Sequence, residues 1–206
     1  LEAQSLCDQN QLAELDRALC TAAENGSSCW PLLLRGARPN ARVAGRTALV
    51  RAVANGHFSA TRELLGYGAN VDTVDLRGDR PLVMAVVNRH VPLVRLLLAH
   101  GAAPDEPDGN GDTPLICATV SGQVELIEAL VEGGADIEAG DADGDTPLVC
   151  AALNGMADAI RALCRAGAEV EACDDDCGEL PLVHAATFGH CAAVQALLEC
   201  GARADV

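Results

Sequence analysis

The chain has 206 residues and a formal net charge of −16, and half of its residues are hydrophobic although only 2% are aromatic. Such a composition predicts a core of many small side chains packed in thin layers. The acidic balance excludes nucleic-acid binding, which needs a basic face. No apolar run is long enough to cross a membrane. We expect a cytoplasmic protein, with the nucleus as the alternative location.

Residues 1–44 contain the first predicted pair of helical segments. Residues 22–26 read AAENG and residues 32–37 read LLLRGA, two apolar segments separated by a turn. The spacing between their glycines is shorter than in the segments that follow, and Trp30-Pro31 interrupts the pattern. We therefore interpret residues 1–44 as a degenerate N-terminal capping repeat.

One phrase then recurs along the chain at a nearly constant interval. Residues 111–122 read GDTPLICATVSG and residues 144–155 read GDTPLVCAALNG, with 33 positions between them. The same opening glycine occurs at Gly45, Gly78, Gly111, Gly144 and Gly178. The predicted units are residues 45–77, 78–110, 111–143, 144–177 and 178–206, the last truncated at its C-terminal end. Neither helix of such a unit can bury its apolar face alone, so neighbouring units must supply the core.

Local signals give the limits of the helices in each unit. Thr113-Pro114 and Thr146-Pro147 place a capping hydroxyl before a proline, which is favoured in the first turn of a helix. A Gly-Ala pair late in every unit predicts the end of the second helix, because glycine accepts the left-handed conformation there.

The pattern G-x-T-P-L-x-x-A-A-x-x-G, followed by a Leu-Leu segment and then by G-A-D/N, resembles the ankyrin repeat family. The resemblance covers residues 45–206 in five in-phase units. It implies an all-α ankyrin-repeat solenoid, in which helix-turn-helix units are joined by projecting β-turn or hairpin loops. It also implies a scaffold for protein–protein interaction, whose partners bind the projecting turns and the exposed face of the first helices.

No pattern in the sequence indicates an enzyme, a cofactor or a metal. The chain lacks a Gly-x-Ser-x-Gly elbow, a phosphate loop and a His-Glu-x-x-His pair, and the five histidines lie largely at turns and helix ends. The turns that begin at Asp108 and Asp141 start like calcium loops but lack the glycine and glutamate that such loops need. Cys173 and Cys177 have a spacing that zinc ligands use, without a second pair, so a zinc site is the lesser alternative there. The ten cysteines are interpreted as small residues in a reducing compartment.

Charge is distributed unevenly and indicates the chemistry of a partner. Residues 1–103 have a formal balance of +2, whereas residues 104–206 have a balance of −18, with acids gathered at residues 105–112, 138–145 and 171–179. We predict that an Arg/Lys-rich peptide or a basic protein surface binds along this half; the alternative is that the acids only confer solubility. The predicted partner-binding residues are Asp112, Asp143, Asp145, Asp175, Asp176 and Glu179 in the turns, and Ser121, Leu153, Asn154, Thr187 and Phe188 on the first-helix face.

All 14 basic residues are arginine. A coding bias explains this composition, but a lysine-free surface also suits the substrate-recruiting arm of a ubiquitin ligase.

The chain begins at Leu1 without a methionine and ends just after its last Gly-Ala turn, so we expect it to be part of a larger protein. The second hypothesis for its role is an autoinhibitory or structural spacer that packs against its own parent chain.

Overall fold

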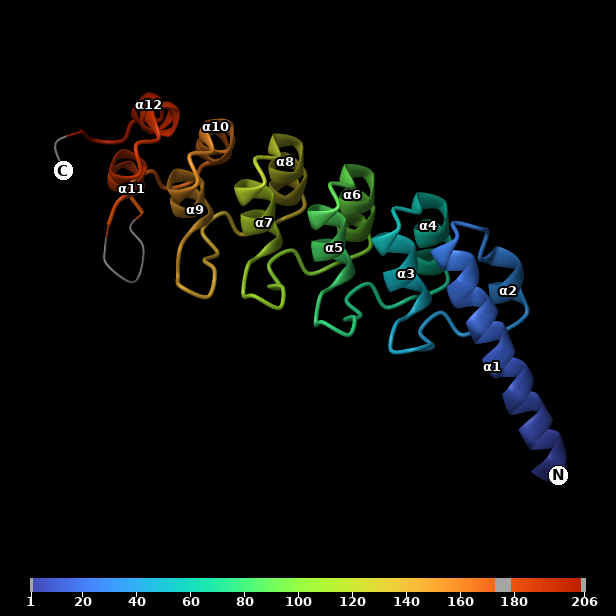
Figure 1. The fold of residues 1–206 in the computed structure, drawn as a ribbon. Coiled ribbons are helices and arrows are strands. Elements are labelled where there is room, and N and C mark those ends of the chain that lie inside the picture. The colour runs from blue at the N-terminus through green and yellow to red at the C-terminus, as the bar shows by residue number, and fades with distance from the viewer. Residues whose placement is uncertain (1, 173–178, 205–206) are drawn as a thin grey trace. The chain divides into compact units, whose positions relative to one another are not determined.

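The structure, a computed structural model, describes residues 2–172 and 179–204, with side chains described from residue 9 onwards (Figure 1). The described residues form twelve α-helices, and their single extended pairing is an isolated antiparallel bridge between Val43 and Arg46. The predicted all-α class is therefore confirmed. The chain divides into two compact units, Leu1–Ala102 and Ala103–Val206. Among the described helices, none combines the length and the apolar character needed to span a bilayer.

The first unit contains three helix pairs. They are α1 (Glu2–Glu24) with α2 (Trp30–Leu34), α3 (Ala48–Ala54) with α4 (Phe58–Gly66), and α5 (Pro81–Val87) with α6 (Val91–Ala99). Helix α3 packs against α1, α4 and α5, so that each pair covers the apolar face of the next. The first helix has 23 residues, whereas α3 and α5 have seven each. The predicted capping repeat, residues 1–44, thus begins with a much longer helix than its AAENG segment indicates.

The second unit repeats the same arrangement. Its helix pairs are α7 (Pro114–Val120) with α8 (Val124–Glu132), α9 (Pro147–Leu153) with α10 (Ala157–Ala166), and α11 (Pro181–Thr187) with α12 (Cys191–Glu199). The first helices pack side by side in one layer and the second helices in another. Figure 1 shows α8, α10 and α12 on one side of this unit and the loops that precede α7 and α9 on the opposite side. Leu115, Leu130 and Leu148 are fully buried between the layers.

The local signals act as the sequence predicts. The hydroxyl oxygens of Thr113 and Thr146 accept hydrogen bonds from the backbone N–H groups of Ile116 (3.3 Å) and Val149 (3.4 Å), which caps α7 and α9. The glycine of every Gly-Ala pair has a φ between 80° and 103°, the left-handed conformation expected past the end of a helix. None of the cysteines whose side chains are described forms a disulfide.

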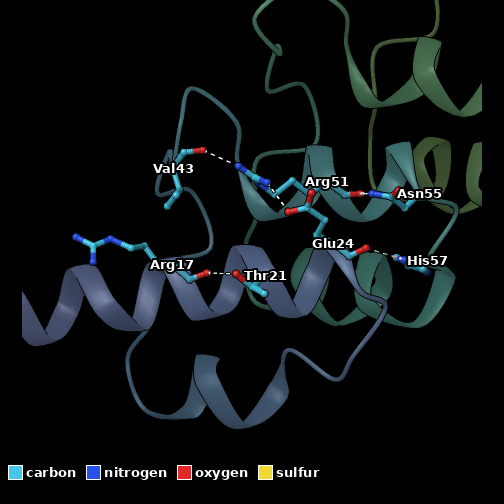
Figure 2. Close-up of polar contacts among 7 residues, drawn as sticks. All are labelled: Arg17, Thr21, Glu24, Val43, Arg51, Asn55 and His57. Atoms are coloured by element: carbon cyan, nitrogen blue, oxygen red, sulfur yellow. Dashed lines mark hydrogen bonds and ion pairs between the residues drawn. The ribbon is translucent and has the colours of Figure 1, made fainter.

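Polar contacts join α1 and the loop after α2 to α3 and the start of α4 (Figure 2). The Arg51 guanidinium on α3 forms an ion pair with the Glu24 carboxylate at the end of α1, at 2.5 Å, and also donates to the Val43 carbonyl at 2.9 Å. The His57 ring lies 3.0 Å from the Glu24 carbonyl oxygen through its Nε2 atom. Because these partners come from different repeats, the contacts hold α1, α3 and the intervening loop together.

Two of the histidines contact the backbone of the preceding helix pair through their rings, in addition to standing at helix ends as expected. His57 and His190 occupy the N-cap positions of α4 and α12, but neither caps its own helix through the side chain. The His190 ring instead lies 3.0 Å from the Leu153 carbonyl at the end of α9, which repeats the contact of His57 in the first unit. His184 is the exception among the turn histidines, since it lies inside α11 and is buried.

Candidate partner-binding site

The turns before α7 and α9 have the same backbone geometry. One carboxylate oxygen of Asp108 accepts hydrogen bonds from the N–H groups of Asn110 (2.7 Å) and Asp112 (3.1 Å). Asp141 accepts from Asp143 and Asp145 in the same way, at 3.0 Å each. An aspartate that satisfies the backbone donors two and four residues ahead stabilises a tight projecting turn. The first aspartate of each turn therefore has a structural role.

The acids of one turn therefore differ in role, although they are the same residue type in the sequence. The predicted site residues Asp112, Asp143 and Asp145 follow the aspartate that organises each turn, and their backbone N–H groups are its donors. Asp143 is exposed, whereas Asp112 and Asp145 are half-buried. Asp108 and Asp141 are absent from the predicted set. The sequence signal for them is an aspartate that stands two and four residues before the backbone N–H groups of the turn.

Neighbouring turns act on one another through their charges. The pKa of Asp112 is raised, mainly because burial disfavours the ionised carboxylate, and further by the negative charges of Asp108, Asp141 and Asp143. Asp141 and Asp143 belong to the next turn along the chain. The carboxylates of residues 108–112 and 141–145 are thus close enough to repel one another, and we call these two turns together the acidic turn surface.

The predicted residues at the first helices lie at the helix ends. Leu153 and Thr187 are the last residues of α9 and α11, and Ser121, Asn154 and Phe188 are the residues that follow α7, α9 and α11. Phe188 is 61% exposed, so its ring can contact a partner. Leu153 is half-buried and therefore offers a partner less of its surface.

Two of the polar residues in this group are already engaged within the chain. The Ser121 hydroxyl donates to the Ala118 carbonyl at 2.9 Å, and the Asn154 amide donates to the Cys150 carbonyl at 2.8 Å. Thr187 is exposed. The side chains of Ser121 and Asn154 thus each use one donor within the chain, while the Ser121 hydroxyl oxygen and the Asn154 amide oxygen keep acceptor capacity for a partner.

The third predicted acidic turn is described only in part. Asp175 and Asp176 lie outside the described residues, as do Cys173 and Cys177. Glu179 is exposed, and its carboxylate lies 3.7 Å from the Nδ1 atom of the buried His184. This places one negative charge of the third turn at the start of α11.

Two groups of residues have the donor atoms that a metal ion would need. They are Asp108, Asp112 and Cys117 at the turn before α7, and Asp141, Asp145 and Cys150 at the turn before α9, with the ligand atoms of each group within 4.8 Å of one another. In the second group the Cys150 thiol donates to the Asp141 carboxylate at 3.6 Å. Burial, followed by the two carboxylates, raises the pKa of Cys150, so the thiol keeps its proton. The group therefore joins the turn to α9, and it could ligate a metal only after losing that proton.

Comparison with known proteins agrees with this geometry. A family model described as ankyrin repeats (3 copies) matches residues 3–75, 52–141 and 137–206. A crystal structure of an ankyrin repeat domain from Acinetobacter baumannii AYE is similar to this chain, with a TM-score of 0.82 and 29% sequence identity. The similarity covers 90% of this chain and 98% of that one. A search of the curated proteins finds no match. The family matches and the paired helices together show that the chain belongs to the ankyrin repeat family.

Proposed function

We propose that the chain is a non-catalytic recognition module that binds a basic, Arg/Lys-rich segment of another protein along the acidic turn surface. Ankyrin repeats are in general protein–protein interaction modules, and this is the level of function that membership of the family provides. The chemistry of the partner is argued from the charges of the second unit.

The observation that carries the proposal is the gathering of carboxylates in the two neighbouring turns of residues 108–112 and 141–145, each organised by its first aspartate. The pKa of Asp112 is raised in this setting, first by burial and then by three neighbouring carboxylates. A guanidinium or ammonium group placed beside Asp112 would relieve the repulsion between these charges and would be attracted by all of them. Each exposed ion pair contributes only about 0–1 kcal/mol, so several charges of the partner must act together. An extended segment with repeated basic residues meets this requirement.

An apolar contact would complete the recognition. The Phe188 ring stacks on the His190 ring, with 6.3 Å between the ring centroids and an interplanar angle of 22°. Its exposed face offers a rigid aromatic anchor of the kind that dominates the affinity of many interfaces. We therefore expect the preferred partner to contain an apolar residue near its basic residues.

The test is binding of fluorescently labelled peptides, with matched basic and neutral sequences, measured by anisotropy at low and at physiological salt. The double variant Asp112→Asn/Asp143→Asn is expected to weaken binding of the basic peptide about fivefold to tenfold. The matched control is Glu125→Gln/Glu128→Gln, which removes two exposed charges from α8, outside the turns. Equal losses in the two variants would refute the acidic turn surface as the site and leave the acids as a source of solubility.

The same experiment bears on the alternative role as an autoinhibitory or structural spacer. Such a spacer would bind a segment of its own parent chain rather than a separate basic protein, so no basic peptide of foreign sequence should bind with selectivity.

The absence of lysine supports the finer proposal of a substrate-recruiting arm of a ubiquitin ligase, since this chain offers no lysine side chain to ubiquitin. That role predicts that a bound basic protein is ubiquitinated while the chain itself is not.

A further inference from the structure

The first unit contains an open cavity of about 620 Å³ between α1 and the loop that follows α2. The residues that line it include Arg17, Arg38 and Arg42, the buried Asp16, and small apolar residues such as Ala13 and Ala41. These residues supply three guanidinium groups and one carboxylate, a local formal charge of +2 in a chain whose formal net charge is −16. We call this region the arginine cavity.

Only one of the three guanidinium groups is neutralised. The Asp16 carboxylate is 3% exposed and lies 2.6 Å from the Arg38 guanidinium, so these two charges compensate each other. Arg42 donates to the Gly45 carbonyl at 2.9 Å and to the Thr73 hydroxyl at 3.4 Å, both of which are uncharged. The Arg17 guanidinium bonds to no described residue, and in Figure 2 it meets none of the other labelled side chains. Arg17 and Arg42 therefore keep their full charge for a ligand.

The backbone of the loop also offers donors. Val43 and Arg46 pair with each other through N–H and carbonyl groups, at 2.9 Å and 3.3 Å, which forms the narrow end of the loop. The N–H groups of Arg42 and Ala44, on either side of Val43, have no hydrogen-bond partner among the described residues. An extended peptide can satisfy such donors with its carbonyl oxygens. A guanidinium in turn forms strong paired hydrogen bonds with a carboxylate.

We propose that the arginine cavity is a second recognition site, which binds an acidic peptide segment through the Arg17 and Arg42 guanidinium groups. Glutamate or aspartate side chains of the segment pair with the two arginines, and small residues between them pack on the alanine-lined wall. The site is separate from the acidic turn surface and has the opposite charge preference. The chain therefore recognises two kinds of segment, a basic one on its second unit and an acidic one on its first.

The test uses the 206-residue chain and a labelled ten-residue peptide of alternating Glu and Ala, with an alternating Gln and Ala peptide as the neutral probe. The acidic peptide is expected to bind and the neutral peptide to bind at least about tenfold more weakly. Arg17→Gln/Arg42→Gln is expected to lower the affinity for the acidic peptide about tenfold, because each exposed pair contributes roughly threefold to fivefold. Arg17→Gln alone should lower it about threefold, and it removes no hydrogen bond or ion pair of the guanidinium, because Arg17 is exposed and its guanidinium bonds to no described residue.

The matched control is Arg35→Gln/Arg62→Gln, which removes two exposed guanidinium groups that lie outside the cavity. Its affinity for the acidic peptide should change by less than about twofold. Equal losses in the two double variants, equal binding of the neutral peptide, or unchanged binding by the cavity variant would each overturn the proposal. Binding of the basic peptide to the cavity variant should remain normal, so failure of this site and failure of the acidic turn surface give different results.

Discussion

Replacement of Asp16 by Asn is expected to destabilise the first unit without affecting the second. Asp16 lies on α1 and accepts three hydrogen bonds from Arg38, one from the backbone N–H at 2.8 Å and two from the guanidinium at 3.0 Å and 2.6 Å. These bonds fix the loop that follows α2 against α1. Asparagine keeps one acceptor oxygen, but it places an NH₂ group, which can only donate, near the guanidinium.

The expected cost follows from the exposure of the two partners. A hydrogen bond that involves a charged group contributes about 1.5–3 kcal/mol to stability. Asp16 is 3% exposed, but the Arg38 side chain is 61% exposed, so water can solvate the guanidinium once its partner is lost. We therefore expect a loss of about 2 kcal/mol in the free energy of unfolding of the first unit. With an m-value of about 1–3 kcal/mol/M, the urea midpoint should fall by about 1 M.

The single tryptophan makes this measurable. Trp30 lies on α2 of the first unit, with its ring centroid 5.0 Å from that of Tyr67, so its fluorescence reports on this unit, while circular dichroism reports on all helices. Repeat arrays unfold in segments, so the two signals can separate. Glu14→Gln is the control, because Glu14 is exposed on the same helix and its removal should shift the midpoint by no more than about 0.3 M. Equal fluorescence midpoints for the two variants would refute the reasoning.

Three further predictions concern the second unit. Gly155→Ala should cost at least about 2 kcal/mol in thermal unfolding, because the φ of Gly155 is 68° and an added Cβ would lie 2.8 Å from the His190 ring. Asp112→Asn should raise the melting temperature near pH 7, with the gain fading as the pH falls. Burial raises the pKa of Asp112 above its ordinary value of 3.8, so the ionised form destabilises the fold and protonation removes that cost. Maleimide labelling near pH 8 should modify the exposed Cys191 long before Cys164, since burial and a neighbouring thiol raise the pKa of Cys164 to about 12.

The first two predictions each have a control variant, and for the third the labelling rate of Cys191 serves as the reference. Gly122 has a φ of 66° and an added Cβ would lie 3.4 Å from the nearest atom, so Gly122→Ala isolates the backbone strain. A cost equal to that of Gly155→Ala would exclude a role for the His190 contact. Glu125→Gln removes an exposed charge, and an equal rise in melting temperature would point to net charge rather than burial at Asp112. Labelling of Cys164 as fast as Cys191 would contradict the thiol prediction.

The repeat architecture could be predicted from the sequence because its signals are local. The capping hydroxyls of Thr113 and Thr146 act on backbone groups three residues ahead, and each Gly-Ala pair ends the helix that directly precedes it. Such contacts depend on a few neighbouring residues, so their spacing along the chain is enough to place the helices. The length of α1 was not predicted, since residues before the AAENG segment lack these signals.

The candidate site was predicted only in outline. The sequence showed that acids gather at the turns. It could not distinguish the roles of Asp108 and Asp112, because both are aspartates of the same turn. Only the folded backbone shows that one carboxylate accepts the turn hydrogen bonds while the other carries a raised pKa. The sequence also gave no reason to join Arg17 with Arg42, because they are far apart along the chain. They line one cavity because the loop after α2 is bonded to α1. Local preferences reach only a few residues, whereas the meeting of distant charges depends on how the helices pack.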